Sequence, residues 1–467
     1  MNQEFERIKA YISDKRPFIE STLARLVRIP SVRSAPEPGA PYGRECRHAL
    51  DETAAIFREN GFAAEVSDDG YSLAHYGGGV RKIGVFGHAD VVPVNDGWML
   101  GEPFSAKLIG DFMIGRGTGD DKAGVVASLL AAMAIRDLGL PFAAELEIFT
   151  GSNEESGMGD ICAYRDAHVL PEVSIVPDAA FPLYRGEKGI LRFWAVSRRR
   201  FEDIISFEGG DAFNIVLGKA SVGLRAPISV SDEGLTLSDG GKTLSATGLS
   251  KHAALPEGSK NAAFMLAGAL EKVVCANDRA VLSALLELAG NYCEGLGVAE
   301  DDPIFGKNTS ATGMVRLRDG RLAVSFDVRY APCTDDPVRT VRERLDKLGF
   351  DCEIESDRPG FIIGDDNEFL KLLLSVYSEC TGAVDPKPCV NGGGTYARYL
   401  KNAFGIASAC WRRPPFDLPA GHGGCHQPDE YVSIDGIADA AAILAYMLLR
   451  IDGRLTEQYQ TETGLSH

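Results

Sequence analysis

Short apolar runs alternate with a long helical stretch from Lys82 onward. This alternation is typical of parallel strands, because each crossover between two parallel strands needs a helix or an equally long connection. We therefore predict an α/β unit with a largely parallel sheet. The expected strands are residues 83–86, 146–149 and 173–176, and the expected helix is 123–135.

The middle third of the chain has a different pattern. Residues 322–328 alternate between apolar and polar side chains, which predicts a strand with one face buried and the other in water. Glycine-rich loops return after about Phe361, and a last apolar helix is expected over 434–449. We therefore predict an α+β domain that is inserted into the first one. The expected division is 1–187 and 362–467 for the first domain and 188–361 for the inserted domain.

Composition and charge exclude several classes of function. The 467 residues include 66 acidic and 48 basic side chains, and the net charge of −18 disfavours nucleic acid and anionic lipid as partners. The longest apolar run is shorter than the ~20 residues that a membrane span needs. A polar N-terminus and ten cysteines without a CxxC pair favour a cytoplasmic protein with reduced thiols. We expect neither nucleic acid nor membrane as a partner.

Histidines and acidic residues collect just past the predicted strands or in glycine-rich loops. Each has an ordinary explanation by itself: a loop hydrogen bond for a histidine, helix capping for adjacent aspartates, solvated charge for adjacent glutamates. Because parallel strands end at the same edge of a sheet, we expect these side chains to converge. The candidates are His88 with Asp90, the pairs Asp120–Asp121 and Glu154–Glu155, Asp178 and His426, and of the two adjacent aspartates one could cap the helix while the other points into a cleft.

Nitrogen and oxygen ligands without cysteine suit one or two zinc, cobalt or manganese ions that keep positions open for water and substrate. This is the pattern of a catalytic metal rather than a structural one. The sequence contains no G-x-S-x-G motif and no cysteine in a nucleophile motif, so covalent acyl transfer has no obvious nucleophile.

These motifs resemble those of the aminoacylase and carboxypeptidase family of co-catalytic zinc metallopeptidases, most closely its PepV-type branch of Xaa-His or carnosinase-like dipeptidases. The resemblance implies a mostly parallel-sheet catalytic domain with an inserted α+β, ferredoxin-like lid domain. The motifs occur in the family's order and span most of the chain: HADVVP at 88–93, GRG at 115–117 with DDK at 120–122, EE at 154–155, PD at 177–178 and HQPDE at 426–430.

The resemblance also implies a set of metal ligands for two Zn²⁺ ions, with Co²⁺ or Mn²⁺ as alternatives. Asp120 would bridge the two ions, His88 and Asp178 would bind one, and Glu155 and His426 would bind the other.

Two further roles follow from the resemblance. Glu154 would be the general base that activates water, and Asp90 would accept the second imidazole N–H of His88. His422 competes with His426 as a ligand, but the residues that follow a family ligand are matched only after His426, apart from Asp429, where asparagine is commoner.

The inserted domain would contribute to the same reaction. His252, within GLSKHAALPEG at 248–258, resembles the lid histidine that stabilises the oxyanion, and Asn214 resembles a second oxyanion donor. Arg329 matches an arginine that holds the substrate's terminal carboxylate. The remaining expected substrate contacts are the loop residues Gly393, Gly394 and Thr395.

The first hypothesis is a di-zinc dipeptidase that hydrolyses short unblocked peptides. The alternative within the same family is an N-acyl-amino-acid deacylase or carboxypeptidase, and a third, from another class, is a noncatalytic acidic binding protein with a relic site. The ~250 residues between Asp178 and His426 exceed what dimeric relatives need for their inserted domain. We therefore also predict a monomer whose small peptide substrate meets a complete site within one chain.

Overall fold

The computed structural model describes residues 3–463, which form two compact units. The first unit extends to Arg185, includes Ile363–Cys389 and resumes at Thr395. The second unit consists of Gly186–Ile362 and Val390–Gly394. The main boundaries lie close to the expected ones, but the expected scheme had placed 390–394 in the first domain.

The first unit is built on a sheet whose centre is parallel. Strands β6, β3, β7 and β22 run parallel to one another, and β1 and β2 continue the sheet in antiparallel pairing beyond β6. The predicted mixed α/β class is confirmed, with parallel pairing concentrated at the centre. The strands in sheet order are β1 (Ala63–Val66), β2 (Tyr71–Gly77), β6 (Glu145–Gly151), β3 (Lys82–His88), β7 (Val173–Val176) and β22 (Ala403–Gly405).

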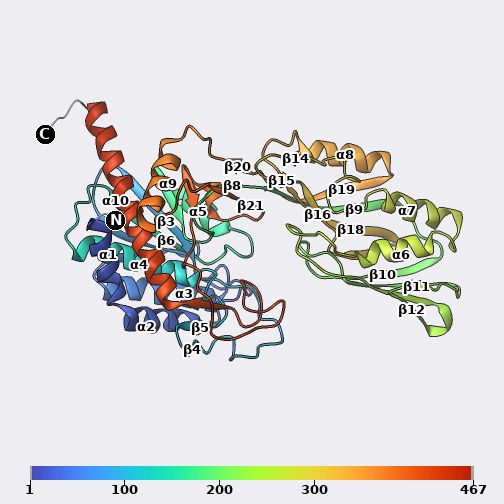
Figure 1. The fold of residues 1–467 in the computed structure, drawn as a ribbon. Coiled ribbons are helices and arrows are strands. Elements are labelled where there is room, and N and C mark those ends of the chain that lie inside the picture. The colour runs from blue at the N-terminus through green and yellow to red at the C-terminus, as the bar shows by residue number, and fades with distance from the viewer. Residues whose placement is uncertain (1–2, 464–467) are drawn as a thin grey trace. The chain divides into compact units, whose positions relative to one another are not determined.

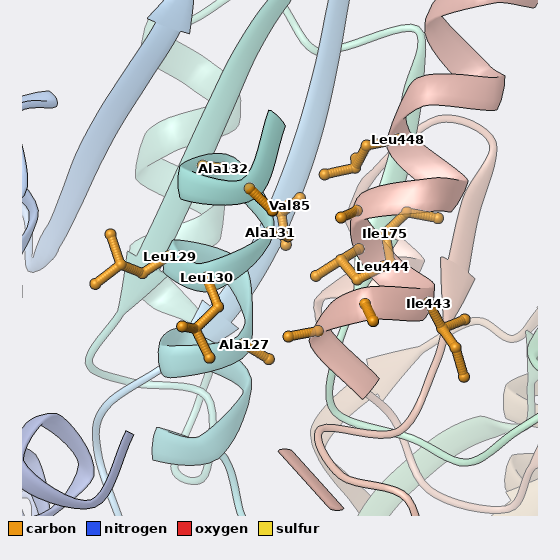
Figure 2. Close-up of a cluster of buried hydrophobic side chains, with 14 of the residues drawn as sticks. Val85, Ala127, Leu129, Leu130, Ala131, Ala132, Ile175, Ile443, Leu444 and Leu448 are labelled. Atoms are coloured by element: carbon orange, nitrogen blue, oxygen red, sulfur yellow. The ribbon is translucent and has the colours of Figure 1, made fainter. Parts of the chain in front are cut away.

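Helices enclose this sheet, and two of them form the centre of the core. Helix α4 (Lys122–Asp137) and helix α10 (Ile434–Thr463) pack together, and Leu130 and Leu444 are fully buried there beside Val85 of β3 (Figure 2). Helix α10 continues well beyond the expected end at 449. Figure 1 labels the other α-helices of the unit: α1 (Gln3–Ser13), α2 (Arg16–Val27), α3 (Arg44–Glu59), α5 (Gly159–Ala167) and α9 (Glu368–Thr381). The unit also contains the short 3-10 helix η2 (Tyr396–Tyr399).

Several short strands complete the first unit. A three-stranded sheet joins the segment before α4 to the segment before α10. It therefore brings the loop of Asp120 near the loop of His426. Its strands are β4 (Lys107–Ile109), β5 (Phe112–Ile114) and β23 (Tyr431–Ser433); the remaining short strands near the unit boundary are β8 (Tyr184–Glu187), β20 (Phe361–Ile362) and β21 (Cys389–Asn391).

The second unit combines two larger antiparallel sheets and a two-stranded one with three α-helices, which is an α+β arrangement. Its five-stranded sheet consists of β16 (Thr309–Ala311), β17 (Val315–Arg318), β18 (Arg321–Tyr330), β9 (Gly189–Arg200) and β19 (Phe350–Arg358). Its four-stranded sheet consists of β10 (Ile204–Glu208), β11 (Lys219–Leu224), β13 (Thr243–Thr247) and β12 (Leu235–Ser238). The other elements are α6 (Ala262–Leu270), α7 (Ala276–Leu286), α8 (Pro337–Lys347), η1 (Asp239–Gly241), β14 (Asp301–Asp302) and β15 (Gly306–Lys307).

Strand β18 corrects one expectation. Its polar positions were expected to face water, yet Ser325, Asp327 and Arg329 are all buried. They are buried because β18 pairs with other strands on both edges and because each polar group has a partner inside the unit. The Ser325 hydroxyl accepts a hydrogen bond from the Met314 amide at 2.8 Å, and Asp327 forms ion pairs with Arg329 and Arg192.

The sequence predicted reduced cysteines and no membrane-spanning segment. All ten cysteines lie among the described residues and are free thiols. Across 3–463, no helix is both long and apolar enough to span a membrane.

Candidate active site

The predicted ligands gather at one edge of the central sheet. Strands β6, β3 and β7 are parallel neighbours, so their carboxyl ends meet at this edge. His88 is the last residue of β3, Glu154 and Glu155 follow β6, and Asp178 follows β7. The remaining two ligands come from loops: Asp120 lies just before α4, and His426 lies in the loop before β23.

The carboxylate of Asp120 lies between two imidazoles. Its Oδ1 is 3.0 Å from His88 Nε2, and its Oδ2 is 3.1 Å from His426 Nε2. A second carboxylate approaches each imidazole nitrogen: Asp178 Oδ2 is 3.8 Å from His88 Nε2, and Glu155 Oε1 is 3.0 Å from His426 Nε2. An imidazole nitrogen carries at most one proton, so one hydrogen bond cannot account for two carboxylates facing the same nitrogen.

The same arrangement fits cations between these atoms. Ligand bonds of about 2.0–2.2 Å in tetrahedral geometry place ligand atoms roughly 3.3–3.6 Å apart, which is close to the separations observed. Glu154 adds a buried Oε1 that has no hydrogen-bond partner among the described residues. Two overlapping sets offer converging ligand atoms: His88 with Asp120 and Glu155, and His88 with Glu154 and Asp178.

Without a nearby positive charge, the ionised carboxylates of this cluster are destabilised by burial and by their mutual repulsion. Burial, reinforced by the neighbouring Asp120, raises the pKa of Glu155 to about 7. Burial also raises the pKa of Glu154 well above its ordinary value, with Asp178 and Glu155 adding to the effect. For Asp120, burial raises the pKa, but hydrogen bonds from His426 and His88 outweigh it and hold that pKa far below the ordinary value. Buried carboxylates with such opposed shifts are typical of catalytic centres.

Asp90 holds the loop of the two glutamates. Its Oδ1 accepts the Glu154 amide at 3.1 Å, and its Oδ2 accepts the Glu155 amide at 3.2 Å. The expected contact with His88 is the weaker one: the imidazole Nδ1 is 3.0 Å from the backbone carbonyl of Asp90 and 3.5 Å from its carboxylate. The main partners of the carboxylate are therefore two amides, because the turn after β6 brings them closer than the ring.

We predict that Asp90→Asn lowers kcat/KM about 10- to 100-fold, the range observed when a group that supports a metal ligand is lost. The new amide nitrogen must face one of the two N–H groups, which leaves that donor unpaired and displaces the glutamate loop. The measurement is peptide hydrolysis at saturating metal. Asp452→Asn is the matched control, because Asp452 accepts the amides of Ala143 and Ala144 at the opposite end of β6. Equal losses in both variants would contradict the assignment.

Asp121 and His422, the sequence alternatives to Asp120 and His426, have other partners. Asp121 stands at the N-cap of α4 but makes no capping hydrogen bond with its side chain. Its Oδ2 is instead 3.3 Å from the His88 amide, which donates to it. His422 places Nδ1 2.7 Å from Asp429 Oδ2, so it is His426 that faces Asp120 and Glu155.

The expected contributors from the inserted domain lie in the second unit. Asn214 and His252 are neighbours there, with 3.5 Å between Asn214 Nδ2 and His252 Nε2. Arg329 is buried, donates through Nε to Asp327 at 2.5 Å and donates through Nη1 to the Gly392 carbonyl at 3.2 Å.

The glycine-rich loop lies across the unit boundary. Gly393 and Gly394 belong to the second unit, and Thr395 begins a segment of the first. The Gly393 amide donates to the Asn391 side chain at 2.9 Å, and Thr395 caps η2 by accepting the Ala397 amide at 3.2 Å.

One residue beside the site was not predicted. Asp160 is fully buried and accepts the amides of Ser152 and Asn153, both at 2.8 Å, together with the hydroxyl of Tyr396 at 2.6 Å. It therefore supports the same glutamate loop as Asp90. Its only local sequence signal is an aspartate near the start of a helix, which is too common to indicate such a role.

A family model supplies the decisive comparison. The model described as peptidase family M20/M25/M40 matches residues 84–450, which is most of the chain. The chain belongs to this family. The predicted family and the predicted enzyme class, a peptidase, are thereby confirmed. The matched range includes the five predicted metal ligands and the predicted general base Glu154.

Relatives of this M20 peptidase agree with that result. It is 27% identical over 478 residues to "Putative dipeptidase YtjP" of Bacillus subtilis, with 97% of this chain and 100% of the relative covered. It is 26% identical over 476 residues to "Putative dipeptidase SSP1012" of Staphylococcus saprophyticus, with 96% and 98% covered.

Solved structures share the fold. The di-peptidase Dug1p of Saccharomyces cerevisiae has a TM-score of 0.63 at 14% identity, with 97% of this chain and 99% of the other covered. Human carnosine dipeptidase 1 has a TM-score of 0.58 at 14% identity, with 96% and 100% covered. At these identities the likeness concerns the fold alone.

Proposed function

We propose that this M20 peptidase is a dipeptidase that binds two divalent cations, with Zn²⁺ as the first choice and Co²⁺ or Mn²⁺ as alternatives. The observation that carries the proposal is the Asp120 carboxylate between His88 and His426, each of which faces a further carboxylate. The names of the two bacterial relatives support dipeptides as the substrate class.

In this proposal the residues of the cluster divide into two ligand sets that share one member. Asp120 would contribute to both sets, His88 and Asp178 would complete one, and Glu155 and His426 would complete the other. When bound, the cations make a water more acidic and polarise the carbonyl of the scissile bond.

Glu154 is the proposed general base. Its buried Oε1 has no protein hydrogen-bond partner among the described residues, so it is free to accept a proton from the attacking water. The raised pKa of Glu154 suits proton transfer, because a more basic carboxylate holds the proton until the leaving amine takes it. Asp90 and Asp160 keep the loop of Glu154 in place through its backbone amides.

The second unit is proposed to act as a lid. His252 and Asn214 would stabilise the negative charge that develops on the substrate oxygen, and Arg329 would bind the terminal carboxylate. Gly393, Gly394 and Thr395 are proposed as substrate contacts. The monomeric state and the cytoplasmic location stay predictions.

The test compares an unblocked dipeptide with its N-acetyl derivative. We expect the unblocked peptide to have a kcat/KM at least about 100-fold higher, because acetylation removes the positive charge of the amino terminus and a dipeptidase site that binds this group would be left unpaired. The measurement identifies the products that the metal-loaded chain forms from each substrate: the C-terminal amino acid when the peptide bond is cleaved, and acetate when the acetyl amide is cleaved. Preference for the N-acetyl derivative would favour the deacylase or carboxypeptidase alternative, and hydrolysis of neither would favour the binding protein.

A further inference from the structure

We propose that the ion pair between Arg116 and Glu430, called here the buried pair, fixes the loop of Asp120 to the loop of His426 and so determines the affinity of one of the two cation positions. This inference rests on the proposed two-cation site. It gives a role to two motif residues that the mechanism leaves unused. Neither residue touches the reacting atoms, so both are positioning residues.

The glutamate of the buried pair binds the loop that delivers Asp120. Glu430 Oε1 accepts the amide of Gly119 at 3.0 Å and the amide of Asp120 itself at 3.3 Å. Its Oε2 accepts Arg116 Nη1 at 2.6 Å. Each side chain of the pair is only 1% exposed, so no solvent replaces these bonds if one is lost.

The arginine of the buried pair binds the loop that delivers His426. Arg116 Nη1 also donates to the carbonyl of Gln427 at 3.2 Å, one residue after His426. In the opposite direction, the Gly115 amide donates to the carbonyl of Glu430 at 2.9 Å. The two loops are therefore joined by bonds that run both ways, and the 3.1 Å contact between His426 Nε2 and Asp120 Oδ2 lies between them.

The two cation positions depend on this connection to different extents. His88 is the last residue of β3 and Asp178 follows β7, so the parallel pairing of these strands holds those ligands without help from the loops. His426 lies in a loop, and its approach to Asp120 and Glu155 depends on where that loop is held. Disturbing the buried pair should therefore weaken the His426 position much more than the His88 position.

Two variants test the role of the buried pair. Glu430→Gln keeps the shape of the side chain and one acceptor for the amides but removes the charge that faces Arg116, and removing one partner of a buried ion pair is strongly unfavourable. Arg116→Lys keeps the charge but shortens the side chain and removes Nη1, the nitrogen that donates to both Glu430 and Gln427. Asp452→Asn is again the control, because Asp452 is a buried carboxylate that accepts backbone amides elsewhere in the same unit.

The experiment is a zinc titration of the full chain after removal of its metal, combined with metal content of the purified protein. We expect two Zn²⁺ per chain for the unsubstituted protein and for Asp452→Asn. For Glu430→Gln we expect one Zn²⁺ to lose little affinity, through the shared ligand Asp120, and the other to bind about 10- to 100-fold more weakly, with a smaller weakening of the same ion in Arg116→Lys.

The outcomes separate this inference from the proposed function. Two ions at unchanged affinity in both variants would overturn the role of the buried pair, and so would equal weakening of both ions. Should Glu430→Gln not fold, the affinities of Arg116→Lys decide by the same criteria. An unsubstituted chain that binds fewer than two ions would contradict the proposed two-cation site itself.

Discussion

Replacing Glu154 by Gln should lower kcat for dipeptide hydrolysis by about 10³-fold, within the 10²–10⁴ range of general-base catalysis, while both cations stay bound. Glutamine has the same shape as glutamate but cannot take a proton from water. Because Glu154 is assigned to no cation, the ligands His88, Asp120, Glu155, Asp178 and His426 remain intact. The measurement is kcat on a dipeptide together with metal content on the same sample.

Glu155→Gln provides the contrast, because this neighbouring glutamate is proposed as a ligand. Its Oε1 lies 3.0 Å from His426 Nε2, so its loss should reduce metal content as well as activity. If Glu154→Gln retains more than about a tenth of the activity, Glu154 is not the general base, because losing a general base lowers the rate by about 10²- to 10⁴-fold. Loss of metal from this variant would instead make Glu154 a ligand.

The sequence was most informative where local pattern and site coincide. Strands β3, β6 and β7 are short apolar runs, and polar groups that could act as ligands lie at their carboxyl ends or within a few residues of them. Since parallel strands end at the same edge, the sequence alone predicts that His88, Glu154, Glu155 and Asp178 lie near one another.

The sequence was least informative where pairing is non-local. Arg116 and Glu430 are 314 positions apart, so no spacing indicates that they form one ion pair. The alternation over 322–328 predicted a solvent-exposed face, because an alternating pattern shows only which side chains are polar. Asp327 is nevertheless buried, since Arg192 and Arg329 in the same sheet form ion pairs with it. Asp120 and Asp121 are adjacent and identical in type, so local pattern does not distinguish them. The family resemblance points to Asp120, and its carboxylate is the one that lies beside both imidazoles.

Removing the metal should abolish hydrolysis and lower the free energy of unfolding of this peptidase. A ligand that binds only the folded chain stabilises it by ~4 kcal/mol when its concentration is a thousandfold above its dissociation constant. The metal-free cluster also leaves buried carboxylates without the positive charge that offsets their repulsion. The measurement is activity and thermal unfolding of the metal-free chain after the chelator has been dialysed away, followed by re-addition of Zn²⁺.

The stability lost on metal removal should also depend on pH, and the direction of this dependence follows from the pKa shifts of two proposed ligands. In the metal-free chain the pKa of Glu155 is raised by burial from 4.5 to about 7. That of His426 is raised from 6.5 to about 11, because hydrogen bonds to Asp120 and Glu155 outweigh burial. Both groups hold protons more tightly in the folded chain than in the unfolded one, so between about pH 5.5 and 8 the stability of the metal-free chain falls as pH rises.

The metal-loaded chain should behave in the opposite way over the same range. Its ligands must be deprotonated, so metal binding releases protons and its apparent affinity grows with pH. We therefore expect the difference in Tm between loaded and metal-free protein to widen steadily from about pH 5.5 to 8. Replacing His426 by Ala should flatten this trend, because it removes the group with the larger shift, whereas Asp452→Asn should leave it unchanged. A Tm difference that is constant with pH would show that these two side chains do not bind the cation.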